Sequence, residues 1–215
     1  MILQPTNGGR FVSAKRLPSG YQQVAHISDV QRRSFINTGL AINPDTGILV
    51  RAIFSYDVYV AAVRSSGVDD RFYAPFRENG LFAYGYKTNM YTQTPVIHGA
   101  IQEVELNYKN SHLVKVDGIT VGTIDGTLSC PFPLYLFAAN VSNNPNPYST
   151  TTASPICYFE RTDGQSVTQQ FVPCYQIPTG IIGMYDKRGT ICSLTNSPFY
   201  INSGDGTFEK GNNIY

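Results

Sequence analysis

Apolar and polar residues alternate from Glu103 to Tyr108, with Val104, Leu106 and Tyr108 on one side of the pattern. A period of two predicts a β-strand that turns one face to the interior. Further along, Asp117-Gly118 stands between the apolar stretches Val114–Val116 and Ile119–Val121. An Asp-Gly pair in this position favours a type I′ turn, which needs positive φ at both central residues. The segment from Gln102 to about Ile124 is therefore predicted to be an antiparallel meander.

The rest of the chain carries the same kind of signal, with short apolar runs between turn residues. Further strands are predicted within Ile48–Val63 (broken at Ser55–Asp57), Leu81–Tyr86, Leu134–Ala139, Ile156–Glu160, Gln169–Tyr175 and Gly180–Tyr185. Asp125-Gly126 and Asp163-Gly164 are predicted turns. The 15 tyrosines, 12 phenylalanines, 19 glycines and 13 prolines also favour strands and turns over long helices. We therefore predict an all-β fold, an antiparallel β-sandwich or jelly roll.

Charge is sparse, at 14% of residues with a net charge of +1. This balance argues against a nucleic-acid partner, because the phosphate backbone usually demands a basic surface. The longest mainly apolar run, Pro131–Val141, is shorter than the roughly 20 residues of a membrane span. The first residues show no export signal, so we expect no membrane partner and no export by that route. The cysteines at 130, 157, 174 and 192 lack zinc-ligand spacing and are expected to be reduced thiols.

Two stretches near the ends of the chain carry a family resemblance. The first contains Leu17-Pro18-Ser19-Gly20-Tyr21, Val24, Ile27 and Ile36-Asn37-Thr38-Gly39, and the second contains Phe171-Val172-Pro173-Cys174, Gly183-Met184-Tyr185-Asp186-Lys187 and Phe199–Phe208. Together they resemble the LamG-like, concanavalin A-like jelly-roll modules of bacteriophage structural proteins and of gut-bacterial surface proteins. The resemblance covers about Leu17–Phe208. It implies a concanavalin A-like jelly roll over residues 17–215, preceded by a short N-terminal arm, residues 1–16.

The resemblance alone does not fix a function, and the function that we expect is structural. We expect a non-enzymatic virion protein, either a capsid auxiliary (decoration) protein or a fibre component, that forms homo-oligomers and contacts other virion proteins. A surface poor in charge suits such packing against protein. Attachment is expected through the arm, with Arg10, Phe11, Lys15 and Arg16. The alternative is a carbohydrate-binding adhesin module on the surface of a gut bacterium.

Two segments are candidates for contact with a partner or a host-surface glycan. The first is a tyrosine-rich stretch that contains Tyr73, Tyr84, Tyr86 and Tyr91. Sugar sites combine aromatic platforms with amide and carboxylate groups, although these tyrosines would equally pave a sheet face or a subunit contact. The second is the long, uncharged loop Asn140–Pro155, with Asn143, Asn144, Asn146 and Tyr148. Long loops without regular structure are often functional.

Catalytic and metal-binding patterns are weak. Glu103 and Glu105 share a strand face, which raises a second alternative, a glycoside hydrolase. The glycosidases that resemble this fold carry a third acid nearby, where this chain has Asn107 and Tyr108. Paired acids on a solvent-exposed strand face are usually just solvated, so we expect no enzyme. Asp69-Asp70 and the Asn140–Pro155 loop offer oxygen ligands to calcium but lack EF-hand spacing, so no metal ligand and no cofactor is predicted.

Overall fold

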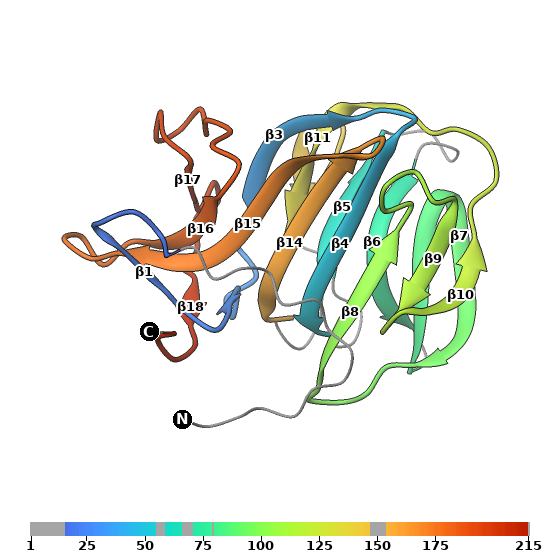
Figure 1. The fold of residues 1–215 in the computed structure, drawn as a ribbon, viewed down its shortest axis with the longest axis horizontal. Helices are drawn as coiled ribbons and strands as arrows, with labels where there is room; N and C mark the ends of the chain where they lie inside the picture. Colours follow the sequence, from blue (N-terminus) through green and yellow to red (C-terminus); the bar gives the residue numbers. More distant parts are fainter. Residues whose placement is uncertain (1–15, 55–58, 66–70, 79, 147–153, 215) are drawn as a thin grey trace.

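The chain folds into two β-sheets packed face to face (Figure 1). This computed structural model describes residues 16–54, 59–65, 71–78, 80–146 and 154–214, and within them every regular element is a strand and none is a helix. All strand pairings in these ranges are antiparallel except that of β12 with β5. The predicted all-β fold, an antiparallel β-sandwich, is confirmed.

The larger sheet holds the middle and the C-terminal part of the chain. Its main path, in spatial order, is β10 (Ile119–Thr123), β9 (Leu113–Val116), β8 (Ile101–Leu106), β4 (Thr46–Ile53), β14 (Ile156–Asp163), β15 (Ser166–Gln176), β16 (Ile182–Asp186) and β17 (Phe199–Ile201). Three short strands flank this path: β1 (Tyr21–Gln23), β2 (Ile27–Ser28) and β18 (Glu209–Lys210). β1 pairs with β15, while β2 pairs with β14 and β18.

The two ends of the described chain pair with each other beside this sheet. Val24 forms a bridge with Asn213, and β2 pairs with β18. Between these contacts, the Ala25 N–H donates to the Asn212 carbonyl at 2.8 Å and the Gly211 N–H donates to the His26 carbonyl at 3.0 Å. The N- and C-terminal segments therefore form one antiparallel ladder, which we call the terminal ladder.

The smaller sheet holds most of the N-terminal half. Its path is β13 (Asn144–Asn146), β12 (Ala139–Val141), β5 (Ala61–Arg64), β11 (Cys130–Leu136) and β3 (Ile36–Ile42), with β6 (Arg71–Glu78) beside β5 and β7 (Leu81–Pro95) beside β6. β3 and β4 follow each other in the chain but lie in different sheets. The connections thus pass repeatedly between the two layers.

β7 reverses direction within its own length. The Val96 N–H donates to the Gly80 carbonyl at 2.9 Å, and the Thr92 hydroxyl donates to the Phe82 carbonyl at 2.8 Å. A straight strand of this length would hold its ends roughly 50 Å apart. The chain must therefore turn back near Lys87, whose φ is +63°.

The interior lies between the sheets and follows the alternation of the strands. Val104 and Leu106 of β8 are at most 1% exposed, and Asp117 and Gly118 have φ of +50° and +81°. The predicted meander with its type I′ turn is therefore confirmed as β8, β9 and β10. The alternation stops at Asn107, where φ is +49°. Its side chain is buried, and its Nδ2 donates a hydrogen bond to the Thr46 carbonyl.

Part of the predicted Asn140–Pro155 loop is regular structure, which corrects that prediction. Its first residues form the hairpin of β12 and β13. Ser142 and Asn143 occupy the turn with φ of +51° and +68°. Asparagine tolerates this conformation better than most residues, so an Asn-rich sequence that favours a loop also favours this tight turn. Residues 147–153 lie outside the described part of the chain.

A buried arginine links the two sheets. Arg161 of β14 is 2% exposed, and its guanidinium donates to the carbonyls of Leu40 and Ala41 at 2.9 and 2.6 Å. It also donates to Thr46 Oγ1 at 3.2 Å and pairs with Asp163 at 3.0 Å. A buried charge is tolerated when it is paired and hydrogen-bonded, and here five donor contacts meet that condition.

Candidate functional site

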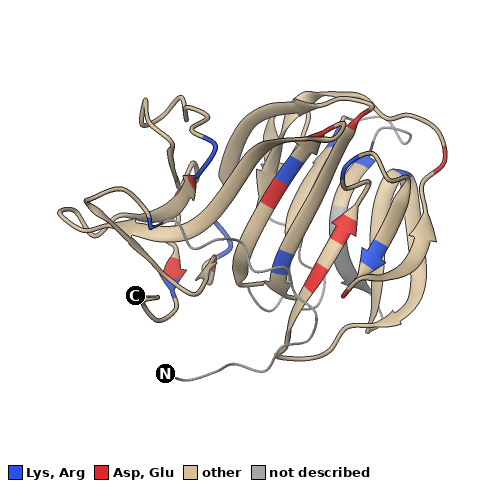
Figure 2. Ribbon diagram, viewed as in Figure 1, with Lys and Arg blue, Asp and Glu red and all other residues tan. Residues whose placement is uncertain are grey.

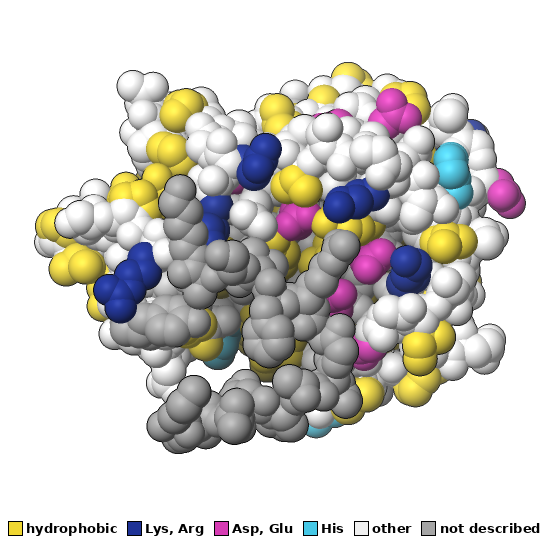
Figure 3. Space-filling view, viewed as in Figure 1, with side chains coloured by type: hydrophobic (Ala, Val, Ile, Leu, Met, Phe, Trp, Pro, Cys, Tyr) yellow, Lys and Arg dark blue, Asp and Glu magenta, His cyan; other side chains and the backbone are white. Residues whose placement is uncertain are grey.

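Polar side chains gather on the outer face of the larger sheet, which we call the front face. Figure 2 shows acidic and basic residues as bands across β14, β4, β8 and β9. The alternation of β4 explains part of this pattern, because it buries Ile48 and Val50 and so turns Leu49 and Arg51 to the front face. Figure 3 shows this face with cations and acids close together.

Strand register lines up the front-face side chains in two rows. One row, across β8, β4 and β14, is Glu103, Arg51 and Tyr158. The other row, from β9 to β15, is Lys115, Glu105, Leu49, Glu160 and Gln170. Residues paired across neighbouring strands project on one side, about 5 Å apart. The two rows therefore make a continuous strip.

The first row is organised by Arg51. Its Nε pairs with Glu103 Oε2 at 2.6 Å, and its guanidinium carbon lies 5.5 Å from the centre of the Tyr158 ring. Both members of the ion pair keep about a quarter of their side-chain surface exposed. Arg51 is thus held between a carboxylate and an aromatic face, a position in which a guanidinium can interact with both.

In the second row, Glu160 is the shared hydrogen-bond acceptor, and it is 6% exposed. The phenols of Tyr108 and Tyr158 donate one hydrogen bond to each of its carboxylate oxygens. Gln170 Nε2 donates to the Tyr158 hydroxyl at 2.7 Å and to Glu160 Oε2 at 3.2 Å. Burial and the hydrogen bond to Glu160 raise the pKa of the Tyr158 phenol far above its ordinary value, so it remains a proton donor. We call Arg51, Glu103, Tyr108, Tyr158, Glu160 and Gln170 the front-face cluster.

The predicted acidic pair, Glu103 and Glu105, does lie on one face of β8. Each carboxylate has its own cation: Glu103 pairs with Arg51, and Glu105 pairs with Lys115 at 3.4 Å. Residues two apart on a strand are about 6.5–7 Å apart, whereas the carboxyls of a retaining glycosidase are about 5–5.5 Å apart. This arrangement is that of two surface ion pairs and gives the glycosidase alternative no support.

Three of the four predicted contact tyrosines are buried, Tyr84 and Tyr86 in the core between the sheets and Tyr73 in a small cluster on the outer side of the smaller sheet. Tyr73, Tyr84 and Tyr86 are 1%, 4% and 7% exposed, so they have almost no surface to offer a ligand. They are large aromatics on the central part of a sheet, where burial is the dominant contribution to stability. The expectation of contact through these three residues is corrected. Tyr91 on β7 is 61% exposed and remains available.

The asparagine group is exposed but far from Tyr91. Asn143 and Asn144 are exposed and Asn146 is half-buried, all on the β12–β13 hairpin. β5 and β6 separate this hairpin from β7, so the structure does not bring the two predicted groups together. Tyr148 lies outside the described residues, as do Asp69 and Asp70.

Only one of the predicted arm residues, Arg16, falls within the described part of the chain; Arg10, Phe11 and Lys15 lie outside it. Arg16 lines a shallow cavity of about 210 Å³ together with Leu17, Tyr21, Gln22, Gln23 and Ile214. The predicted attachment through the arm stays a prediction.

Sequence reasoning missed the front-face cluster, apart from Glu103. The cluster joins β8 and the turn after it to β14, and its members Tyr108 and Glu160 are 52 positions apart in the chain. A single sequence carries no local signal for such a pairing. The one available signal was the alternation of Leu49, Arg51 and Ile53 with buried residues, which marks a polar position opposite Glu103.

Exposed apolar side chains gather at two opposite ends of the molecule. At the end formed by the β15–β16 turn and the β16–β17 loop, Ile177, Ile181, Ile191 and Leu194 are 44–59% exposed. At the other end, around β7, β8 and β10, Met90, Tyr91, Ile97, Ile101 and Ile119 are 43–70% exposed. Figure 1 places β16 and β10 far apart along the longest axis. We call these groups the β16 end and the β10 end.

The described residues contain no group of three or more His, Cys, Asp or Glu side chains that could hold a metal ion. All four cysteines are free thiols, and burial raises the pKa of Cys157 to about 11 and that of Cys174 to about 12. No helix of a length and hydropathy suited to crossing a membrane occurs in the same residues. Comparison with the models of known protein families and with curated protein sequences finds no match.

Proposed function

We propose that this chain is a non-enzymatic structural subunit of a bacteriophage particle, a capsid auxiliary or fibre component, in which a concanavalin A-like jelly roll packs against other virion proteins. The resemblance of Leu17–Phe208 to such modules supports the particle and the jelly roll. The observation that carries the packing is the pair of apolar ends. Large exposed apolar groups are a mark of protein–protein contact when they gather in one place.

The two ends differ in sequence and structure, which bears on how copies would associate. A contact between the β16 end of one copy and the β10 end of another uses two different surfaces. Such heterologous contacts close into rings or continue into filaments. Both outcomes suit a subunit that is repeated by symmetry in a particle. Fully burying an exposed isoleucine or leucine side chain contributes about 1.5–3 kcal/mol. The four residues of the β16 end are about half exposed, so each would contribute about half of that to association.

The proposal is tested by the oligomeric state of the purified full-length chain, measured by light scattering across a range of concentrations. We expect wild type to associate and the double variant I177D/I181D to be monomeric. The matched control is V30D, because Val30 is 50% exposed and belongs to neither apolar end. A wild-type protein that is monomeric at the highest concentration, or a double variant that associates like V30D, would contradict the packing proposal.

The particle part of the proposal needs its own measurement. Phage particles that lack the protein would be incubated with purified protein, and its co-sedimentation with them would be measured. We expect wild type to join the particles. Absence of any association with head or tail structures would count against a virion role and leave the location on a bacterial surface.

A second candidate, a glycan-binding adhesin module, is favoured by the front-face cluster. Its partly exposed members, Glu103, Tyr108 and Gln170, supply carboxylate, aromatic and amide groups, the chemistry that sugar sites use. Tyr158 and Glu160 are buried and would hold these groups in place. The test is a glycan array with wild type and Q170A, because Gln170 donates to both Tyr158 and Glu160. The control is Lys115→Gln, at the end of the same row but outside the cluster. Binding that Q170A loses and K115Q keeps would support the adhesin, and an array without signal would remove it.

A further inference from the structure

The outer face of the smaller sheet, which we call the back face, carries a row of like charges. Register places Arg64 of β5 opposite Arg71 of β6, and Arg71 opposite Lys87 of β7. All three side chains are half-buried. Like charges directly opposite each other destabilise a sheet, so this row lowers the stability of the free protein unless an anion accompanies it.

No carboxylate of the described residues forms an ion pair with these cations; Asp69 and Asp70, which precede Arg71, lie outside the described residues. The ion pairs of the described residues involve Arg51, Lys115 and Arg161, and none of them involves the back-face row. The Lys87 ammonium reaches toward Gly126, where an added Cβ would lie 2.9 Å from Nζ. Within the described part of the chain, the two arginines therefore face each other without a carboxylate partner.

The phenol of Tyr73 lies close to both guanidinium groups. Tyr73 follows Arg71 by two residues on β6, pairs across the sheet with Ala62, and hydrogen-bonds with Arg64. Both arginine charges act on this phenol. Even so, burial raises the pKa of Tyr73 above its ordinary value, so the phenol stays neutral and does not serve as the missing anion. The Tyr59 ring lies 4.9 Å from the Tyr73 ring, tilted by 40°, and packs against the apolar cluster that contains Tyr73.

Arg71 has unused hydrogen-bonding capacity. Its Nε–H is buried and meets no acceptor among the described residues, and its Nη1 reaches Asn89 Oδ1 only at 3.4 Å. A buried donor without an acceptor costs free energy. An oxyanion beside Arg71 would supply this acceptor and the missing charge at once.

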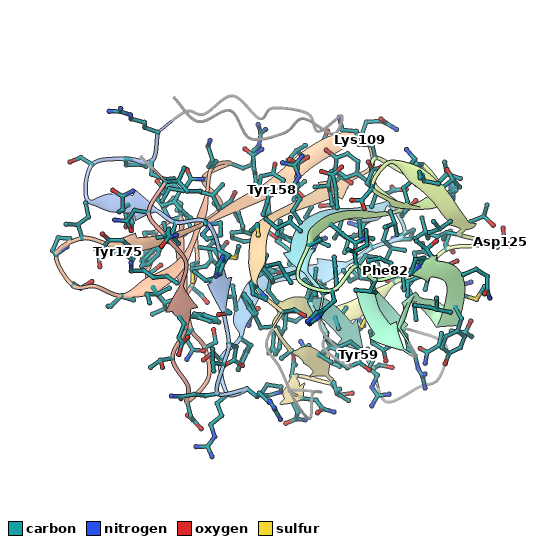
Figure 4. All side chains as sticks on the ribbon, turned by 90° about the horizontal axis from the view of Figure 1, so that it is seen from below. Tyr59, Phe82, Lys109, Asp125, Tyr158 and Tyr175 are labelled. Carbon is teal, nitrogen blue, oxygen red and sulfur yellow. The ribbon has the colours of Figure 1, made fainter. Side chains whose placement is uncertain are left out.

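We propose that Arg64 and Arg71, beside the Tyr73 phenol, form a binding site for an oxyanion, a carboxylate, sulfate or phosphate group. The planar guanidinium matches such groups with two parallel hydrogen bonds. Partial burial strengthens the attraction because screening by water is reduced. This site lies across the sandwich from the front-face cluster: Figure 4 shows Tyr59 and Tyr158 on opposite sides of Phe82. It does not depend on the structural role proposed above.

The first probes are inorganic phosphate and sulfate, titrated into the full-length protein at constant ionic strength and followed by calorimetry. We expect saturable binding by wild type. Arg71→Gln keeps a side chain of similar polarity but removes the charge, and it is expected to weaken binding about tenfold or more. The affinity of Arg71→Lys is expected to lie between those of wild type and R71Q, because lysine keeps the charge and loses the planar guanidinium. The control is Arg188→Gln, which removes an exposed arginine of the β16–β17 loop.

A second readout follows from the repulsion in the row. Without phosphate and at low ionic strength, R71Q is expected to unfold at the same temperature as wild type or a higher one. Phosphate is expected to raise the unfolding temperature of wild type and R188Q, and to leave that of R71Q unchanged. The proposal fails if chloride stabilises wild type as much as phosphate at equal ionic strength. It also fails if R71Q binds phosphate as tightly as R188Q does.

A last comparison distinguishes two sources of the oxyanion, a free ion and an acidic saccharide. A sulfated disaccharide and its unsulfated parent are titrated beside inorganic sulfate. Binding of the sulfated sugar at least tenfold tighter than that of the ion assigns the site to an acidic saccharide. Equal affinity for both assigns it to the free ion. In either case the affinity must fall in R71Q.

Discussion

Arg161 carries its charge in the interior, where the sandwich offers it two carbonyls, a hydroxyl and a carboxylate. Its position is unusual because the neighbouring residues of β14, Tyr158 and Glu160, place their polar groups on the opposite face. The side chain of Arg161 thus fixes β14 of the larger sheet to the end of β3 in the smaller one. A structural requirement, rather than a ligand, accounts for the most buried basic side chain among the described residues.

Replacing this guanidinium tests that interpretation. Arg161→Ala leaves the Leu40 and Ala41 carbonyls without their donors and the Asp163 carboxylate without its cation. We expect the free energy of unfolding to fall by about 3–5 kcal/mol, measured by urea denaturation. Arg51→Ala removes a half-exposed pair and is expected to cost about 1 kcal/mol or less. Equal losses in the two variants would show that Arg161 has no special structural role.

Asp163 makes the stability of the Arg161 link between the two sheets depend on pH. Burial alone would raise its pKa, but the Arg161 hydrogen bond and charge, with hydrogen bonds from Thr168 and Thr46, outweigh it and lower the pKa. A carboxyl whose pKa is lower in the folded state stabilises the fold above the unfolded-state pKa of about 3.9. That contribution is lost as the pH falls through the lowered folded-state pKa.

Asp163→Asn is therefore expected to be less stable than wild type near neutral pH. The difference should shrink as the pH falls below about 4. Thermal unfolding measured at a series of pH values checks this. The exposed Asp205→Asn, outside the link, serves as the control and should show no such convergence. A D163N deficit that stays constant down to the lowest pH would contradict the assignment.

Glu105 tests the predicted absence of enzymatic activity. Because Glu105 is engaged with Lys115 on an open sheet face, Glu105→Gln is expected to change the free energy of unfolding by about 1 kcal/mol or less. We expect neither wild type nor E105Q to release reducing ends from a broad panel of polysaccharides. Turnover by wild type that E105Q abolishes would restore the glycosidase alternative.

At the scale of elements, local signals were sufficient for β8, β9 and β10. Alternation gave the buried face, and Asp117-Gly118 gave the turn, since both signals lie within a few residues. β6 was not predicted, because Arg71–Glu78 lacks a clean alternation and its place depends on β5 and β7. The β12–β13 hairpin was missed because asparagine and proline favour loops as well as turns. The front-face cluster and the back-face row arise from pairings between distant segments, which no local pattern specifies.

The β9–β10 turn gives a prediction at this scale. Gly118 has φ of +81°, and nothing lies within 4 Å of an added Cβ. Gly118→Ala therefore introduces backbone strain without a clash, and we expect a loss of about 1–2 kcal/mol in the free energy of unfolding. Thr120→Ala, on the exposed side of β10, is the control. A G118A variant as stable as T120A would mean that the turn relaxes into another conformation.

At the scale of the whole molecule, every strand of the two sheets lies between Tyr21 and Lys210. We therefore expect a version lacking residues 1–16 to keep the β-rich circular dichroism spectrum of the full chain. If the arm attaches the protein to the particle, the same version should no longer co-sediment with phage particles. Unchanged co-sedimentation would assign attachment to the sandwich itself.

The terminal ladder has a mechanical consequence. Its rungs run from the pairing of Val24 with Asn213 to that of β2 with β18, and the two chain ends leave it on the same side. A pull applied between the ends would load these rungs one after another, as in opening a zipper, instead of shearing them all together. Anchored at one end and pulled at the other, the molecule would therefore yield first where its ends are paired, at the terminal ladder and at the adjoining pairing of β1 with β15, while the rest of the sandwich stayed closed.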